Sequence, residues 1–230
     1  MKKRTRRLLL AGIILLLFIG VGYTYLFHAD EILGASGEVI KGGENTQSLV
    51  VYFTRSDVIK TDGVDATSSA SLNIMEDGHA GNTEIPAKII QNLTGADLYS
   101  IQTKRYYRSP FMGTSATAWI EETFDMRPEL AAKPDSLEKY DVIYVGYPIW
   151  WFNAPMAVGT FLESYDLSGK TIIPFCTSED NGIEVSMDYI RECSKDAKVI
   201  DGLRIAGNSA DEETLREWLT EKGLINEEMD

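Results

Sequence analysis

Residues 141–155 read DVIYVGYPIWWFNAP, and this stretch decides the class of fold. Asp141–Gly146 is apolar almost throughout, which is typical of a strand buried on both faces of a parallel sheet, and an aromatic loop follows it. Leu49–Thr54 (LVVYFT) and Thr171–Phe175 (TIIPF) have the same pattern. Because Pro174 has no backbone N–H, we expect the pairing of its strand to end close to it.

Weaker strand patterns and five helical patterns complete the order of elements. The weaker strands are expected nearer the edges of the sheet, at Asp97–Gln102 and Lys198–Leu203. The apolar stripes of the helices are, in chain order, Ile85, Ile89 and Leu93, ending at Gly95; Trp119, Ile120, Thr123 and Phe124, ending before Pro128; Met156 and Phe161, after Pro155; Ile183, Met187 and Ile190; and Leu215, Trp218 and Leu219, after a capping box of Ser209 and Glu212. Five strands alternating with five helices predict an open, doubly wound α/β sheet with right-handed crossovers. Such sheets bind ligands beyond the carboxyl ends of their strands.

The composition of the 230-residue chain is globular, with an uneven distribution of charge. Hydrophobic residues make up 44% of it and charged residues 25%, which permits a packed core. The formal net charge is −13, although the first seven residues carry five cations, so the remainder is more acidic still. An acidic surface repels phosphate backbones, which argues against nucleic acid as a partner. Two Cys and two His are too few for a Cys/His zinc site or an iron–sulfur cluster, so we expect no metal.

The amino end has the pattern of a membrane anchor. After Lys2–Arg7, Leu8–Phe27 carries no charge, and about 20 apolar residues cross ~30 Å of hydrocarbon as a helix. A cleaved signal peptide is the alternative, but the apolar run is long for one and no clear cleavage site follows it. We expect the basic tip to stay in the cytoplasm, which places the rest of the chain on the outer face of the membrane. Residues 1–27 are thus a basic tip and anchor, residues 28–47 a linker, and residues 48–230 one domain.

The segments after the best strands are suited to binding. Thr54–Ser56 follows the first strand, and after a long insertion Gly81–Thr83 opens the first helix. Hydroxyl groups and the free N–H groups of a helix N-terminus make an anion site, although Asn82 or Thr83 could simply cap the helix.

The aromatic segment Tyr147–Pro155 follows neither a strand nor a helix period. We interpret it as a rigid loop on which a planar heterocycle stacks, at about 1 kcal/mol per aromatic contact. The alternative is an apolar patch that packs against another loop or the membrane. Cys176–Gly182 is small and polar, and it is suited to hydrogen bonding with the edge of the same heterocycle.

Together these segments resemble the flavodoxin family, and the resemblance covers Ser48 to about Ile225. Gly81–Thr83, Gly146–Trp151 and Leu167–Ser178 carry it. The resemblance implies a five-stranded parallel sheet of order 2-1-3-4-5 and FMN as the cofactor. It places the FMN phosphate at Thr54, Arg55, Ser56, Gly81, Asn82 and Thr83, the ring against Pro148, Ile149, Trp150 and Trp151, and the polar edge of the ring near Thr177, Ser178, Asn181 and Gly182.

Two features depart from the usual family pattern, and a segment of the insertion carries a further resemblance. An insertion separates Ser56 from Gly81, so the sequence identifies the groups that contact the phosphate less directly than in a continuous loop. The fourth loop contains Glu179 and Asp180, which we expect to point to water. Within the insertion, Asp65–Ser71 resembles a pattern at which extracytoplasmic transferases attach FMN covalently, with Ser71 as the attachment residue; the alternative is a loop of small residues.

The resemblance implies an FMN protein, tethered to the outer face of the membrane, that passes electrons to an unknown redox partner. No side chain is expected to act as acid, base or nucleophile, because the flavin carries the redox chemistry. Two alternatives are an FMN-dependent NAD(P)H:quinone-type reductase and a flavin-free binding module with Trp150, Trp151 and Phe152 as its contact patch. The basic and aromatic residues Lys104–Arg108 are expected to form a solvated loop, with contact to an anionic partner or a nicotinamide cofactor as the alternative.

Overall fold

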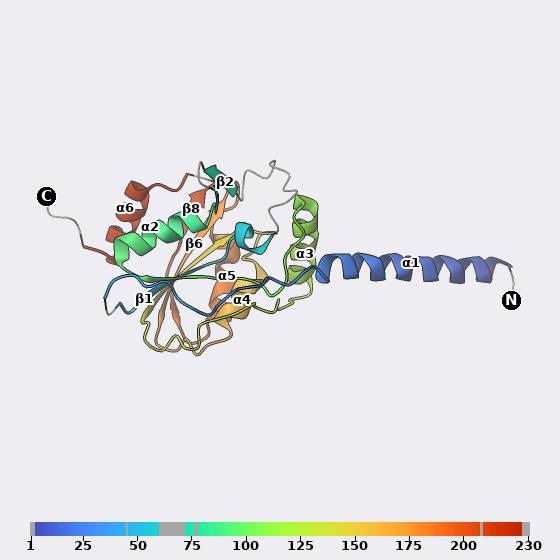
Figure 1. Ribbon diagram of the computed structural model, residues 1–230, viewed down its shortest axis with the longest axis horizontal. Helices are drawn as coiled ribbons and strands as arrows, with labels where there is room; N and C mark the ends of the chain where they lie inside the picture. Colours follow the sequence, from blue (N-terminus) through green and yellow to red (C-terminus); the bar gives the residue numbers. More distant parts are fainter. Residues whose placement is uncertain (1–2, 45, 60–71, 76–77, 208, 227–230) are drawn as a thin grey trace.

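A parallel sheet forms the centre of the molecule (Figure 1). The computed structural model describes residues 3–44, 46–59, 72–75, 78–207 and 209–226, and it describes side chains in 11–44, 46–59, 80–207 and 209–226. The strand order is β4–β1–β5–β6, with β7 and β8 both paired to the outer edge of β6. All these pairs are parallel. The strands are β1 (Ser48–Tyr52), β4 (Asp97–Ser100), β5 (Val142–Pro148), β6 (Thr171–Ser178), β7 (Lys198–Val199) and β8 (Leu203–Ala206).

The sheet confirms the predicted order 2-1-3-4-5 when β7 and β8 are counted as one interrupted edge strand. Two details were wrong. The edge strand continues beyond Leu203, and β6 does not end near Pro174, which pairs with Val145 in mid-strand. The physical reason lies on the other side of β6, where β7 stops opposite Ile172 and β8 resumes opposite Phe175. The ladder is therefore open beside the proline, where no N–H is available to close it.

Helices cover both faces of the sheet (Figure 1). Along β1, Leu49 and Val51 belong to one apolar core, whereas Val50 and Tyr52 belong to the other. The first core is shared with α4 (Met156–Leu162) and α5 (Glu184–Cys193), and the second with α2 (Glu84–Thr94) and α6 (Glu212–Glu221). This two-sided burial explains why the strands are apolar at almost every position.

Most helix boundaries agree with the sequence predictions. Gly95 ends α2 with a positive φ of 66°, and its N–H bonds to the carbonyl of Gln91. The capping box was wrong, because Asp211 caps α6 and accepts from the N–H of Thr214. The hydroxyl of Ser209 instead donates to the carbonyl of Ala206.

Helix α3 (Phe111–Thr123) has the opposite orientation from the one its apolar residues suggested. Its buried residues are Thr114, Thr117, Ala118 and Glu121, whereas Trp119 is 48% exposed and Phe124, just past its end, is 69% exposed. The helix covers the carboxyl-end side of the sheet, where its inner face meets Arg55 and the loops after β4 and β5 instead of a strand surface. Small and polar residues on that face leave room for the pockets described below.

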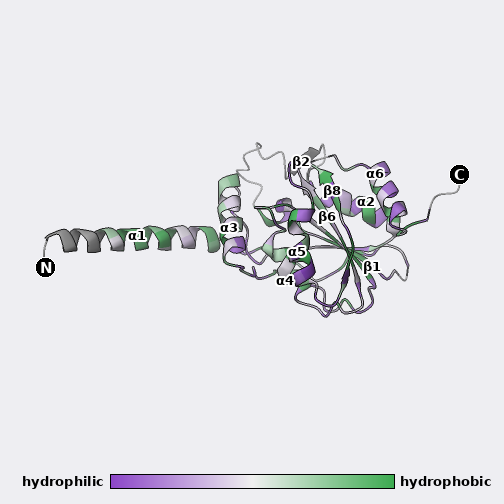
Figure 2. Cartoon of the chain, turned by 180° about the vertical axis from the view of Figure 1, so that it is seen from behind, coloured by the Kyte–Doolittle hydropathy of each residue, from purple (hydrophilic) through white to green (hydrophobic). Residues whose placement is uncertain are grey.

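The amino-terminal helix α1 (Lys3–Phe27) projects from the domain beside α3 (Figure 1). The part with described side chains is largely apolar in Figure 2. Within the described residues, no helix meets the length and hydropathy needed to cross a membrane. Residues 28–44, expected as part of a linker, follow the domain surface, where Ile40 exchanges two backbone hydrogen bonds with Leu98. They therefore extend the β4 edge of the sheet.

Candidate cofactor site

The end of β1 and the start of α2 meet to form the predicted phosphate-binding region. The short helix η1 (Arg55–Val58) follows Thr54, and the insertion returns through the hairpin β2 (Leu72–Met75) and β3 (Gly78–Gly81). It brings Gly81 against Thr54 and Ser56, two residues that lie far from it in sequence. A Cβ atom on Gly81 would overlap Thr54 Oγ1 and would lie 2.6 Å from Ser56 Oγ. The interrupted loop is thus reassembled in space, and its close approach requires glycine.

Thr83 does more than cap a helix. Its side chain makes no capping hydrogen bond, although it occupies the cap position of α2. Instead Thr83 Oγ1 lies 2.8 Å from Thr177 Oγ1, and both residues are buried. Asn82 is also buried, at 2% exposure. This hydrogen bond joins the helix start to the end of β6.

Two carboxylates flank this region. Glu84 accepts a hydrogen bond of 3.1 Å from the N–H of Gly81, and it also pairs with Lys88. Asp57 accepts from the hydroxyls of Ser100 and Ser56. Burial raises the pKa of Asp57, and the charge of Glu84 adds to that rise. The Gly81 N–H is therefore already directed at an anionic group.

Arg55 contributes a buried cation to the same side of the site. Its side chain is only 2% exposed, and its Nε donates to Thr114 Oγ1 of α3 at 3.2 Å. A second nitrogen donates to the carbonyl of Ser109. These bonds connect η1 to α3 and hold the guanidinium at the wall of a pocket.

The aromatic loop forms a tight turn at the end of β5. Trp150 and Asn153 exchange two backbone hydrogen bonds, of 2.8 and 3.0 Å. The two residues at the tip, Trp151 and Phe152, both have positive φ, 48° and 63°. Such backbone is unfavourable for bulky residues and persists where the surroundings hold it. One such restraint is the indole N–H of Trp151, which donates to the carbonyl of Ser115 at 2.8 Å.

A pocket of about 640 Å³ lies between this turn, η1 and α3. Its lining unites residues predicted separately for the phosphate, the ring and the polar edge: Arg55, Ile149, Trp150, Trp151 and Asn181. The remaining predicted residues are not part of its lining, but hydrogen bonds connect several of them to lining residues, directly or through Thr177. Pro148 is buried at the end of β5 and pairs with Thr177, and the N–H of Ile149 donates to the carbonyl of Thr177. The ends of β1, β5 and β6 thus converge, as the sequence predicted.

The sequence prediction missed the α3 wall and Asp180. The α3 wall contributes Phe111, Met112, Thr114, Ser115 and Ala118, and Phe152 of the predicted aromatic loop lines the pocket as well. A signal for this wall exists in the sequence, because Thr114, Thr117, Ala118 and Glu121 recur at the spacing of one helix face.

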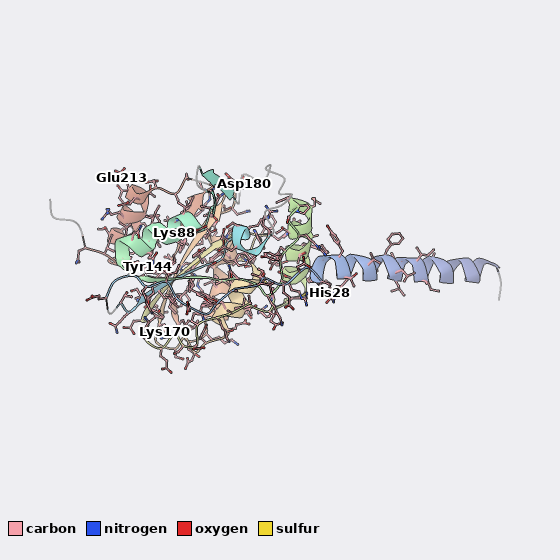
Figure 3. All side chains as sticks on the ribbon, in the orientation of Figure 1. His28, Lys88, Tyr144, Lys170, Asp180 and Glu213 are labelled. Carbon is pink, nitrogen blue, oxygen red and sulfur yellow. The ribbon has the colours of Figure 1, made fainter. Side chains whose placement is uncertain are left out.

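The loop after β6 is held by its own backbone contacts. Ser178 Oγ accepts from the N–H of Asn181 at 3.0 Å, and Gly182 is half-buried before α5. Glu179 and Asp180 are exposed, as expected, but Asp180 is also part of the pocket lining. Figure 3 shows Asp180 and Lys170 at opposite ends of β6. The proposed attachment residue Ser71 lies outside the described residues.

The predicted basic loop has intramolecular partners. Lys104 pairs with Glu129 at 2.8 Å, and Arg105 pairs with Glu31 at 3.2 Å and donates to the carbonyl of Ala29. Arg108 donates to the carbonyl of Tyr25 and lies 4.3 Å from the centre of its ring. These contacts fasten the end of α1 to the domain, which was not foreseen from the sequence.

A family model described as flavodoxin matches residues 77–222. The chain belongs to the flavodoxin family. Recognition of this family from the three loops is therefore confirmed. No match was found among curated proteins.

Solved structures agree with this assignment. A candidate flavoprotein from Bacteroides uniformis is 28% identical with a TM-score of 0.60, covering 78% of this chain and 99% of its own. Another from Bacteroides eggerthii is also 28% identical with a TM-score of 0.58, covering 75% and 95%. A flavoprotein from Lactobacillus acidophilus in complex with FMN shares the fold at 18% identity and a TM-score of 0.52, covering 75% and 97%. The predicted FMN cofactor accords with this family.

Proposed function

We propose that this flavodoxin-family chain binds FMN in the pocket between η1, α3 and the Trp150–Asn153 turn, and that it transfers electrons. The observation that carries the proposal is the convergence of Arg55, Trp150 and Asn181 on one pocket from three separate strand ends. The family resemblance in the sequence assigns Arg55 to the phosphate of the flavin, Trp150 to its ring and Asn181 to the polar edge of the ring. A fold that only used the aromatic loop as a contact patch would have no need to place a buried arginine beside it.

The polar end of the site fits a phosphate group. Arg55 supplies a positive charge, and Asn82 and Thr83 lie at the amino end of α2, where backbone N–H groups favour an anion. The N–H of Gly81 already bonds Glu84, so Gly81 contributes through its small size. The absence of a Cβ on Gly81 keeps the cradle between Thr54 and Ser56 open.

The apolar end of the site fits a planar ring. Trp150 is fixed by edge contacts with Phe53 and Tyr107, with ring centres 5.3 and 5.4 Å away. Trp151 is held by Ser115, so both indoles are oriented before any ligand arrives. Preorientation lowers the entropy cost of binding.

Bound FMN would supply the redox chemistry, and the chain supplies binding, orientation and exclusion of water. Phe111, Met112, Trp151 and Phe152 are all exposed at the rim of the pocket. This apolar rim leaves a path for a redox partner to approach one edge of the ring.

The proposal includes attachment to the outer face of a membrane through α1. Its support is the uncharged stretch Leu8–Phe27 behind a cluster of cations, together with the exposure of apolar side chains such as Leu16 and Phe18. Protease treatment of intact cells tests this part. Digestion of the domain is expected, and protection of the domain in intact but not in lysed cells would contradict it.

The visible spectrum of the purified full chain tests the proposed cofactor. Flavin bands in the blue and near ultraviolet are expected, either at once or after addition of FMN and removal of the excess. A colourless chain that takes up no FMN would overturn the proposal and favour a flavin-free binding module. Steady-state oxidation of NADH or NADPH by the FMN-loaded chain separates a reductase from a simple carrier, and acid precipitation separates covalent from released flavin.

A further inference from the structure

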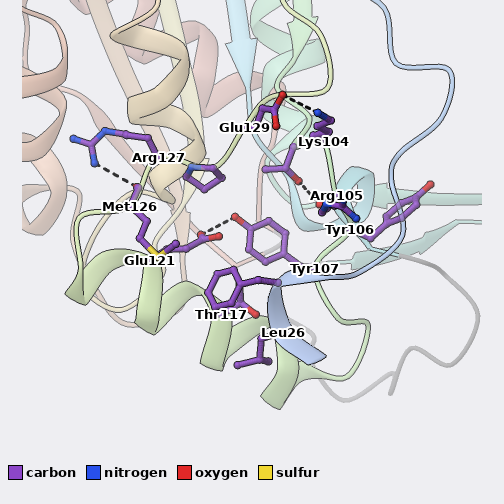
Figure 4. A pocket seen from close by; sticks show the side chains of 13 residues that line it. Leu26, Lys104, Arg105, Tyr106, Tyr107, Thr117, Glu121, Met126, Arg127 and Glu129 are labelled. Atoms are coloured by element: carbon purple, nitrogen blue, oxygen red, sulfur yellow. Dashed lines mark hydrogen bonds and ion pairs between the residues drawn. The ribbon is translucent and has the colours of Figure 1, made fainter. Parts of the chain in front are cut away.

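A second cavity lies beside Tyr107 and the inner face of α3 (Figure 4). Its volume is about 150 Å³, and its exposed surface is mostly apolar. Its walls come from the end of α1, the loop Thr103–Tyr107, the inner face of α3 and the loop Met126–Glu129. Apolar cavities of about this volume can hold a six-membered ring such as benzene.

A single buried acid lies in this cavity. Glu121 is 5% exposed and accepts a hydrogen bond of 2.8 Å from the hydroxyl of Tyr107. Burial raises the pKa of Glu121 to about 7, despite the opposing effect of that hydrogen bond. A carboxyl group of this kind can donate a proton to a ligand near neutral pH.

The cations of the cavity wall already have partners. Lys104 pairs with Glu129, Arg105 with Glu31, and Arg127 with Glu163 at 2.7 Å. The wall therefore offers little net attraction to an anion, and its apolar surface favours an uncharged ring.

One layer of aromatic rings connects the two pockets. Tyr107, whose hydroxyl bonds Glu121, lies edge-on to Trp150 with ring centres 5.4 Å apart. Trp150 in turn lines the proposed flavin pocket. A ligand beside Tyr107 would thus be separated from the proposed flavin pocket by the contact between these two rings.

The cavity also opens beside α1. Leu26 and Phe27, its last two residues, form part of the wall and are half-buried. A ligand dissolved in the membrane proposed to hold α1 would reach this cavity along an apolar surface.

We propose that this cavity binds the ring of a quinone, an uncharged planar carrier of two electrons and two protons, with one quinone oxygen at Glu121. The proposal rests on the flavin function proposed above. Conversion of the quinone to the hydroquinone consumes two electrons and two protons. Bound reduced FMN would supply the two electrons and would release its two protons to water as it is oxidised, while Glu121 would give one proton to a quinone oxygen and water the other. Glu121 is then reprotonated from solvent.

Duroquinone tests the site, because its fully substituted ring does not arylate thiols. We would titrate it into the full chain in detergent micelles, with oxidised FMN saturating the first pocket, and follow quenching of tryptophan fluorescence. Saturable quenching is expected. Thr117→Leu fills the cavity wall, and it should weaken duroquinone binding about tenfold or more because overpacking is poorly tolerated.

Thr160→Leu is the matched control. Thr117 and Thr160 each donate to the carbonyl four residues earlier, Gly113 and Met156, but Thr160 is on α4 and does not line the cavity. The control loses the same kind of hydrogen bond and experiences the same partition of quinone into micelles. Equal quenching of both variants, or no saturable quenching of the native chain, would overturn the proposal.

Glu121→Gln provides a second, independent arm. In the native chain duroquinone affinity should fall as pH rises through about 7, because the carboxylate no longer donates to the quinone oxygen. The glutamine amide donates at every pH, so this variant should lose the pH dependence. An unchanged pH profile would remove Glu121 from the site. The other ionisable groups lining the cavity are Lys104, Arg105, Tyr106, Tyr107, Arg127 and Glu129. A hydrogen bond to Glu129 raises the pKa of Lys104, burial raises the pKa of Tyr107, and hydrogen bonds to Glu163 raise the pKa of Arg127. These three groups therefore keep their charge state through neutral pH.

The two proposals can fail separately. FMN uptake without duroquinone binding would refute the quinone site and leave the flavin function intact. Duroquinone binding by a chain that takes up no FMN would refute the flavin function and, with it, the electron transfer between the pockets.

Discussion

Asp97 and Glu121 are both buried acids, yet they differ in almost every other respect. Asp97 begins β4 at the amino ends of the strands, and it accepts hydrogen bonds from Lys41, Lys139, Tyr140 and the N–H of Gly42. Burial alone would raise the pKa of Asp97, but these donors outweigh it and hold the pKa well below its usual range. Glu121, beside the carboxyl-end pockets, has the single hydroxyl of Tyr107, and burial raises its pKa to about 7.

The difference separates a structural end of the sheet from a functional one. At the amino ends, charges are matched, and they tie residues 41–42 to β4 and to the start of β5. At the carboxyl ends, Arg55, Asn82, Thr83 and Thr177 are buried as well, and Arg55 lines the open pocket. Groups that bind a ligand use part of their hydrogen-bonding capacity for that ligand. We therefore expect substitutions at the amino ends to change stability and substitutions at the carboxyl ends to change FMN affinity.

The largest effect on stability is expected for Asp97→Asn. The substitution removes the charge to which Lys41 and Lys139 bond. Because both lysines are more than half exposed and can regain water, a cost of about 2–3 kcal/mol is expected, within the range for hydrogen bonds to a charged group. Because the pKa of Asp97 is lowered in the folded chain, its stabilisation is present above about pH 4 and is lost as pH falls below that, so native chain and variant should converge in strong acid. Urea unfolding across pH measures this. A tenfold loss of FMN affinity in the same variant would contradict the separation of the two ends.

Glu121→Gln is expected to act in the opposite direction. The raised pKa means that protonated Glu121 is favoured in the folded chain, so its stabilisation is present below about pH 4.5 and is lost as pH rises towards 7. Above that pH the variant should be more stable than the native chain, by at most about 3 kcal/mol. Thermal unfolding at pH 5 and pH 8 provides the measurement. Equal stability differences at both values would show that Glu121 is not buried as an acid.

Gly81→Ala tests the cradle at the end of β1. The new Cβ would overlap Thr54 Oγ1, and relief of that overlap must move a short, β-branched side chain. A cost of about 1–3 kcal/mol is expected, mostly as FMN affinity weakened about tenfold or more. Gly169→Ala is a useful comparison at the amino end, since space is open there although its φ is positive. FMN affinity that is equal in both variants would place the phosphate elsewhere.

Thr83→Val is the mildest of these substitutions. It keeps the shape of the side chain and removes the hydroxyl that bonds Thr177, which leaves a buried hydroxyl without that partner. A loss of about 1 kcal/mol in stability is expected, together with weaker FMN binding. Addition of FMN should restore part of the lost stability, because a ligand that binds only the folded chain stabilises it increasingly as its concentration exceeds the Kd. Normal FMN affinity in this variant would limit Thr83 to holding α2 against β6.

Several sequence predictions depended on local pattern alone, and these agree with the structure. The apolar runs at 49–54, 141–146 and 171–175 became central strands, because burial on both faces imposes a continuous apolar pattern. The Gly95 helix end and the position of the site at the strand ends follow equally from local chemistry and topology. Predictions failed where a distant element decided the outcome, as at Pro174, whose missing N–H faces a break between β7 and β8.

The sequence by itself determined the strand and helix order, the family, and which three segments meet at the site, since these follow from periodicity and topology. Only the tertiary structure decided which face of α3 is buried, that Gly81 returns to Thr54 across the insertion, and that Glu121 lies beside Tyr107. The physical reason is that burial and close approach depend on what the opposite element presents. The residues of Phe111–Thr123 do not contain that information until loops from β1, β4 and β5 are placed against them.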